Sequence, residues 1–206
     1  MADCGFYGKI PSEGDFVSRR LPWEFTSAWD DWLQHGMLAS REALGARWLE
    51  LYLSAPVWRF QLAPGVCGPL GWRGVFFASV DRVGRYFPLT VAFPDAPSAA
   101  SPSPSLAALT ADDESWLAIE DAALAGLEPT LGVDAFDRLI EALAVPAAAA
   151  PAVDAKRPRV CLYSHGSAEM PATGLALDAL PLPAAFVDLI APPPAAPPPS
   201  SLIDLL

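Results

Sequence analysis

The chain has 206 residues, 52% of them hydrophobic, and a mean hydropathy of +0.29, so it has ample material for one domain with a packed core. This composition excludes a chain that is disordered throughout. The net charge is −11 without any basic stripe, and no apolar run approaches the roughly 20 residues of a spanning helix, so neither nucleic-acid binding nor membrane insertion is expected.

The amino terminus and the cysteines indicate a cytoplasmic protein. The opening MADCGFYGKIPSEGD has no basic region followed by an apolar stretch, so it does not resemble a signal peptide. Cys4, Cys67 and Cys161 are widely spaced and odd in number, which suits neither a disulfide framework nor a zinc site. We therefore expect three reduced thiols in a reducing compartment.

The net negative charge comes entirely from one half of the chain. Residues 1–94 hold nine Lys or Arg and nine Asp or Glu, whereas residues 95–206 hold four and fifteen. An acidic carboxy-terminal half repels phosphates, and it is typical of a well-solvated protein. This asymmetry favours a regulatory protein over a nucleic-acid-binding one.

The first part of the chain predicts a strand followed by two helices. Cys4–Ile10 is typical of a short strand, and it ends before a proline and a Gly-Asp turn. Trp23–Ala39 has helical periodicity, with Trp29 and Trp32 on one face. Ser40 is a candidate cap for a second helix that ends at a proline. The apolar stripe of that second helix consists of Leu44, Trp48, Leu49 and Tyr52.

Three apolar runs then predict strands. Val57–Leu62 alternates, with its aromatic residues on one face. Trp72–Val80 and Tyr86–Phe93 are joined by DRVGR, in which Gly84 can adopt a positive φ, so they predict a hairpin at the centre of an antiparallel sheet. Pro88 inside the second run predicts a strand edge or a bulge.

The second half predicts two helices, a strand and a further short helix. The complete order of elements fits a mixed or antiparallel sheet with helices on its faces. Residues 1–190 then form one domain, with Ala- and Pro-rich linkers at about 95–105 and 145–158 and an extended Pro-rich tail at 191–206. The predicted elements are a helix from Asp112 or Asp113 to Leu127, a helix over Asp134–Ala144, a strand over Arg159–Ser164 and a helix over Leu182–Ile190.

No motif for catalysis, for a metal or for a cofactor is complete. His35 and His165 lack neighbouring ligands of metal-site spacing. Adjacent residues of a strand point to opposite faces, so Ser164 and His165 do not predict a nucleophile and its base. Gly8-Lys9 lacks the first glycine and the Ser or Thr of a phosphate-binding loop.

Polar residues nevertheless gather beside aromatic ones in the segments GKIPSEGDF, WDDWL and SVDRVGRYFPL. One interpretation is structural: Asp15 and Asp81 are turn acids or ion-pair partners of the nearby arginines. A second is a recognition surface, because arginine and aromatic side chains are preferred anchors at interfaces. A third is a site for a small ligand or a reaction that uses Asp15, Asp81 and Arg85, with the carboxylates as general acid and base.

Four segments of the first half resemble, in order, the amino-terminal signature of the TagF family, also called ImpM, which is associated with type VI secretion. They are GFYGKIPSEGDFVSRRLP, WDDWL, APVWRF and SVDRVGRYFPLTVAF, which fall within residues 5–94. Chance does not produce four separate motifs in the correct order. The remainder of the chain is similar only loosely, at Trp116-Leu117, RVCLYS and GLALDALPLP.

The resemblance implies an α/β fold, a three-layer αβα sandwich with a mixed, largely antiparallel sheet. It implies a cytoplasmic, non-catalytic repressor of the secretion apparatus that binds a forkhead-associated scaffold protein, and it supplies no catalytic residues. A structural subunit of the apparatus is the alternative within this system. We expect Lys9, Asp15, Asp81 and Arg85 to be exposed, with residues 10–20 and 81–86 together at one end of the sheet. The candidate interaction surface is Lys9, Asp15, Arg19, Arg20, Asp81, Arg82 and Arg85.

Overall fold

The computed structural model describes residues 4–95, 104–110, 114–144 and 158–192. Strands and helices alternate along these ranges in blocks, much as the sequence predicts. The strands are β1 (Gly5–Gly8), β2 (Val17–Arg19), β3 (Trp58–Leu62), β4 (Trp72–Phe77), β5 (Leu89–Pro94), β6 (Val160–Ser164) and β7 (Thr173–Leu177). The α-helices are α1 (Trp23–Leu44), α2 (Trp48–Leu53), α3 (Leu106–Thr110), α4 (Glu114–Ala125) and α5 (Val133–Glu141), and the 3-10 helices are η1 (Gly45–Arg47) and η2 (Pro183–Leu189).

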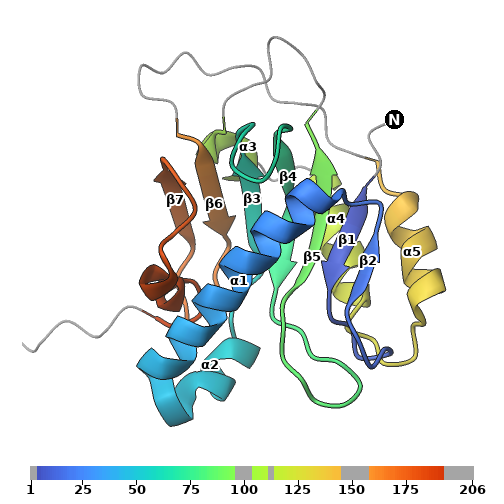
Figure 1. The fold of residues 1–206 in the computed structure, drawn as a ribbon, viewed down its shortest axis with the longest axis horizontal. Coiled ribbons are helices and arrows are strands. Elements are labelled where there is room, and N and C mark those ends of the chain that lie inside the picture. The colour runs from blue at the N-terminus through green and yellow to red at the C-terminus, as the bar shows by residue number, and fades with distance from the viewer. Residues whose placement is uncertain (1–3, 96–103, 111–113, 145–157, 193–206) are drawn as a thin grey trace, which may run out of the picture.

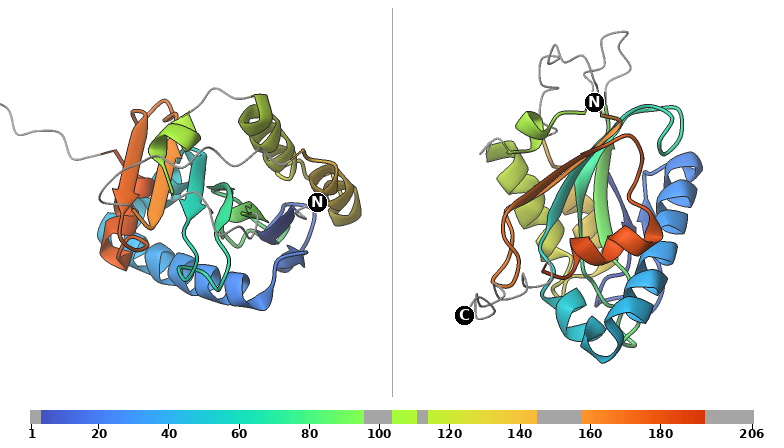
Figure 2. Two further views of the ribbon diagram at one scale, coloured as in Figure 1. Left: turned by 90° about the horizontal axis from the view of Figure 1, so that it is seen from above. Right: turned by 90° about the vertical axis from the view of Figure 1, so that its left-hand side faces the viewer.

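The seven strands form one sheet in the order β2-β1-β5-β4-β3-β6-β7. Every pairing between these strands is antiparallel, so the described sheet has no parallel pair that would make it mixed. The β4–β5 hairpin lies near its centre, as predicted. Figure 2 shows α1, α2 and η2 on one face and α3, α4 and α5 on the other, which confirms the three-layer αβα sandwich.

The first face is packed mainly by aromatic residues. Helix α1 crosses the sheet diagonally in Figure 1 and buries Phe25, Trp29 and Trp32 at helical spacing. The Trp29 ring lies 4.7 Å from that of Phe60 on β3, and its Nε1 donates to Thr90 Oγ1 on β5 at 2.9 Å. A buried indole N–H needs such a partner, so this contact fixes the helix over the centre of the sheet.

The second face buries charged residues among its apolar ones. Arg59 on β3 is fully buried and forms an ion pair with Glu120 of α4, with Nε 2.6 Å from Oε1. Arg73 on β4 pairs with Asp95 in the same way. Buried charges are tolerated only when they are paired and hydrogen-bonded, so Arg59 ties the sheet to α4 and Arg73 ties β4 to the residue that follows β5.

The predicted first residue of the second helix is wrong, because that helix does not begin at Ser40. Ser40 lies inside α1, where its hydroxyl donates to Met37 O and accepts from Trp48 Nε1. Helix α1 continues to Leu44 and ends at Gly45, which has φ +53°. A glycine with positive φ is a common helix terminator, and it decides the boundary here.

Three elements were not predicted, and several predicted boundaries shift. Strands β2 and β7 and helix α3 are short and have weak patterns. Pro88 directly precedes β5, so this proline removes no donor from the ladder of that central strand. The predicted 182–190 helix is the 3-10 helix η2. Most of the predicted linkers and of the Pro-rich tail lies outside the described residues. No helix in the described ranges is long and apolar enough to cross a membrane.

Candidate functional site

Two connections of the sheet meet at one end of the molecule. The β1–β2 connection and the β4–β5 connection both lie at the lower end of the sheet in Figure 1. The backbone N–H of Arg82 donates to Glu13 O at 2.8 Å, and the guanidinium of Arg85 donates to Gly14 O. The structure therefore places the two loops side by side, as expected from the sequence.

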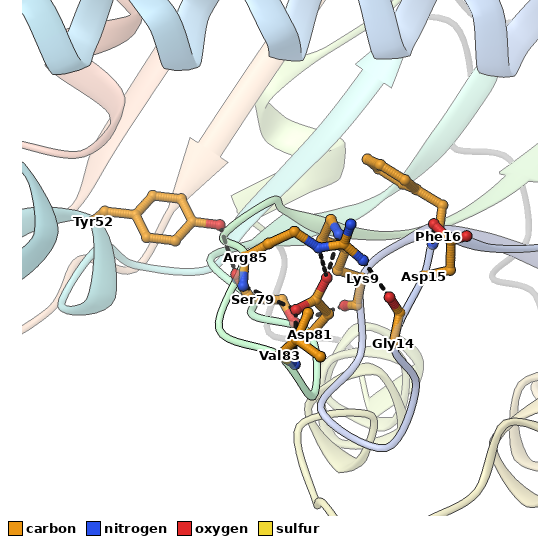
Figure 3. Close-up of polar contacts among 9 residues, drawn as sticks. All are labelled: Lys9, Gly14, Asp15, Phe16, Tyr52, Ser79, Asp81, Val83 and Arg85. Atoms are coloured by element: carbon orange, nitrogen blue, oxygen red, sulfur yellow. Dashed lines mark hydrogen bonds and ion pairs between the residues drawn. The ribbon is translucent and has the colours of Figure 1, made fainter.

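Asp81 is the centre of this loop pair (Figure 3). Its carboxylate accepts from the backbone N–H groups of Val83 at 3.0 Å and Arg85 at 2.9 Å, from Arg85 Nε at 2.7 Å and from Lys9 Nζ. Burial by itself raises the pKa of Asp81, but these hydrogen bonds outweigh it and hold that pKa well below its ordinary value. The carboxylate is therefore a fixed anion that organises both loops.

The expectation that Lys9 and Asp81 are exposed is wrong. Lys9 is 4% exposed and Asp81 is 3% exposed, and together they form an ion pair across the two loops. The Lys9 ammonium also lies 4.6 Å from the centre of the Phe16 ring. Burial is possible because each charge neutralises the other, and the pair holds the loops instead of contacting a partner.

A tyrosine from α2 supports the same loop from the other side (Figure 3). The Tyr52 hydroxyl donates to Ser79 O and accepts from the Ser79 N–H, both at 3.0 Å. The Ser79 hydroxyl in turn donates to Lys9 O at 2.7 Å. This chain of hydrogen bonds connects α2, the β4–β5 loop and the residue that follows β1. The sequence offered no sign of it, because the partners lie far apart along the chain.

Five exposed side chains of the two loops form a small surface, here called the loop surface: Asp15, Phe16, Arg82, Val83 and Arg85. Phe16 is 44% and Val83 64% exposed, and the Phe16 ring packs against the Tyr7 and Phe87 rings. Asp15 accepts only from the N–H of Phe16 within the described residues. Arg82 makes no ion pair in the described part of the chain. The loop surface therefore presents arginines beside apolar anchors.

The two remaining arginines of the candidate surface lie elsewhere. Arg20 is paired with Asp137 of α5, with Nη1 2.6 Å from Oδ1, and its Nε donates to Cys4 O. Arg19 is exposed at the end of β2 that lies opposite Phe6, away from the loops. Their proximity in sequence to Asp15 does not bring them to it, because β2 carries them along the sheet edge.

A shallow pocket adjoins the loops, and none of its lining residues belongs to the candidate interaction surface predicted from the sequence. It has a volume of about 350 Å³ and lies between α1 and the residues that precede β5. The Arg41 guanidinium at its edge stacks 4.1 Å from the centre of the Trp48 ring. One residue could have indicated this pocket from the sequence: Leu38 is apolar but lies outside the apolar stripe of α1. In the structure its side chain is 58% exposed. The lining residues are Gln34, His35, Met37, Leu38, Arg41, Tyr86 and Phe87.

The other candidate groups do not converge into a reactive site. The Ser164 hydroxyl accepts from Gly166 N at 3.0 Å, whereas His165 Nδ1 lies 3.2 Å from the Tyr163 hydroxyl. His35 contacts Asp31 of its own helix. Within the ranges that the structure describes, no group of three or more His, Cys, Asp or Glu is placed to hold a metal ion.

Comparison with known proteins finds a matching family model and a similar crystal structure. Residues 5–143 match the family model of the TagF N-terminal domain, described as type VI secretion system-associated. A crystal structure of PA0076 from Pseudomonas aeruginosa PAO1 is 36% identical, with a TM-score of 0.81 over 95% of this chain and 97% of that one. No curated protein matches the chain significantly.

Proposed function

The chain belongs to the TagF family of type VI secretion system-associated proteins, and we propose that it is a non-catalytic repressor of the secretion apparatus. In this proposal it acts in the cytoplasm by binding a forkhead-associated scaffold protein, and the loop surface makes the contact. The family assignment supports the secretion system as its setting. The loop geometry supports the choice of surface.

One observation carries the choice: the buried charges fix the loops, and the exposed residues remain available. Lys9 and Asp81 satisfy each other inside, while the Arg85 side chain is 55% exposed although it also donates to Asp81. A rigid loop loses little conformational entropy on binding, so its exposed groups bind more tightly than those of a mobile loop. Arginine beside exposed apolar side chains is the composition found at protein interfaces.

The alternative of a reaction at Asp15, Asp81 and Arg85 has less support. A general base has to accept a proton near neutral pH, and the depressed pKa of Asp81 makes it a poor acceptor. Its carboxylate already accepts four hydrogen bonds from Lys9, Val83 and Arg85. Asp15 is exposed and lies on the other loop, where it makes no ion pair with a described residue.

The test is a binding measurement with the purified forkhead-associated scaffold of the same secretion system. Arg82→Glu is the first variant, because that side chain is exposed and makes no described ion pair, so its replacement leaves the buried cluster intact. Val83→Asp is the second, since it removes an apolar anchor. We expect each variant to weaken binding by about tenfold, and the pair together by more.

The matched control is Arg19→Glu, which makes the same charge change at an exposed position away from the loops. It should bind the scaffold as the wild type does. Equal binding by Arg82→Glu, Val83→Asp and the wild type would exclude the loop surface. Absence of wild-type binding to the scaffold would exclude the partner, whatever the variants do.

A further inference from the structure

The two edges of the sheet are protected very differently. Strand β2 at one edge has three residues, and its exposed Arg19 discourages another strand from pairing with it. Strand β7 at the other edge has five residues, TGLAL, and no charge. Among the described residues only β6 pairs with β7. The outer edge of β7 therefore offers a row of backbone donors and acceptors to another extended chain.

An apolar pocket lies beside this edge. It has a volume of about 410 Å³ and is formed by the end of β7, the following turn and η2. Leu175 and Leu177 are half-buried on the strand, and Leu182 is 75% exposed. In a strand added to β7, alternate side chains would point to the same face as Leu175 and Leu177 and would reach this pocket. The apolar lining includes Leu175, Leu177, Leu180, Leu182 and Ala185 with Pro181.

Charge decides what the edge can accept. Asp178 and Asp188 line the pocket, are exposed and make no ion pair with a described residue. The backbone N–H of Arg159 donates to Leu177 O beside this edge, but the Arg159 guanidinium donates to Pro64 O, and the sequence after Arg159 contains four acidic residues and neither lysine nor arginine. Because the two carboxylates have no cationic partner among the described residues, they complement a cation that a binding partner brings. A second copy of the chain would bring the same acidic region and another −11 of net charge.

We propose that the outer edge of β7 binds an extended segment of a partner protein by strand addition. Backbone hydrogen bonds to β7 provide affinity, and apolar side chains at alternate positions of the segment fill the adjoining pocket. A lysine or arginine that flanks the apolar residues meets Asp178 or Asp188. This site lies at the opposite edge of the sheet from β2 and does not depend on the proposed loop surface.

The experiment uses the full chain as bait for a phage-displayed library of random short peptides. Enriched peptides are synthesised, and their binding is measured by fluorescence anisotropy. Ala176→Lys places a charge on the edge at an exposed residue, where a side chain can be added without disturbing the core. The double change Asp178→Lys with Asp188→Lys reverses the charge of the pocket. The control pair Glu42→Lys with Glu50→Lys makes the same charge change on exposed residues of α1 and α2.

We expect the enriched peptides to alternate apolar residues and to carry Lys or Arg at one end. Both test variants should weaken their binding about tenfold or more, whereas the control pair and Arg82→Glu should not change it. Hydrogen exchange at residues 173–177 should slow when the peptide binds. Absence of enriched peptides, or equal binding by the Ala176→Lys variant, would overturn the proposal. Concentration-dependent dimerisation that Ala176→Lys abolishes, without peptide binding, would assign the edge to a second copy and overturn it too.

Discussion

Tyr52→Phe tests whether one hydroxyl group holds the β4–β5 loop in place. The change removes an oxygen that both accepts from Ser79 N–H and donates to Ser79 O. Ser79 O keeps a partner, because it also accepts from Phe87 N at 3.1 Å. Ser79 N–H keeps none among the described residues, although Ser79 is only 2% exposed. The substitution therefore leaves one buried donor unsatisfied.

The expected loss of stability follows from this one unsatisfied donor. A buried hydrogen-bonding group without a partner costs about 1–3 kcal/mol, so we expect Tyr52→Phe to lower the free energy of unfolding by about 2 kcal/mol. For a protein of this size, that corresponds to a decrease in Tm of about 4–8 °C. Urea unfolding followed by tryptophan fluorescence, together with a thermal melt, measures both quantities. Hydrogen exchange should also become faster at Ser79 and in the loop that follows it.

The matched control is Tyr86→Phe. Tyr86 packs edge-on against Tyr52, with ring centres 6.0 Å apart, and its hydroxyl has no hydrogen-bond partner in the described part of the chain. It should change stability by less than about 0.5 kcal/mol. If the two substitutions cost the same, or if Tyr52→Phe costs less than about 0.5 kcal/mol, the hydroxyl does not hold the loop.

Three further predictions concern Asp81, two glycines of the loop pair and the buried cysteines. The pKa of Asp81 is lower in the folded state than in the unfolded one, so the stability that its carboxylate contributes is present above about pH 4 and is lost below it. In urea titrations, the wild type should therefore lose stability relative to Asp81→Asn as the pH falls from 5 to 2. Gly8→Ala should lower the free energy of unfolding by at least about 3 kcal/mol, because Gly8 has φ +140° and a Cβ there would lie 2.1 Å from Pro88 O. Gly84→Ala should lower it by only about 1–2 kcal/mol, because Gly84 has φ +84° but open space around it. Burial raises the pKa of each thiol, so maleimide should label the cysteines rapidly only after unfolding; the values are about 12 for Cys4, about 12 for Cys67 and about 11 for Cys161.

Periodicity predicted the long elements because their burial pattern is regular. The tryptophans of α1 and the alternating residues of β3 lie on the faces that their spacing indicates. Strand β7 was not found, since TGLAL contains a glycine and an alanine and lies at an edge, where burial is partial. Strand β7 forms because it pairs with β6, and no local sequence pattern reveals that pairing.

The site was predicted in its location and not in its organisation. The family resemblance and the turn residues predicted that residues 10–20 and 81–86 lie together, and the structure places the two loops side by side. Lys9 and Asp81 were expected outside because single charged residues usually are. Their burial depends on a pairing across 72 positions, which sequence spacing does not show. Arg20 was assigned to the loops by proximity alone, and Asp137 of α5 decides its place instead.

The charge asymmetry of the sequence becomes an asymmetry in space. Residues 5–94 form the five adjacent strands β2, β1, β5, β4 and β3, whereas the acidic remainder adds β6 and β7 at one edge and α3, α4 and α5 over one face. Arg82 and Arg85 are exposed on the loop surface, whereas Asp178 and Asp188 are exposed at the β7 edge. Surfaces of opposite charge select different partners, because like charges across an interface are repelled. If both proposals hold, the chain can engage two proteins at once, and Arg82→Glu and Asp178→Lys should each weaken binding of one partner only.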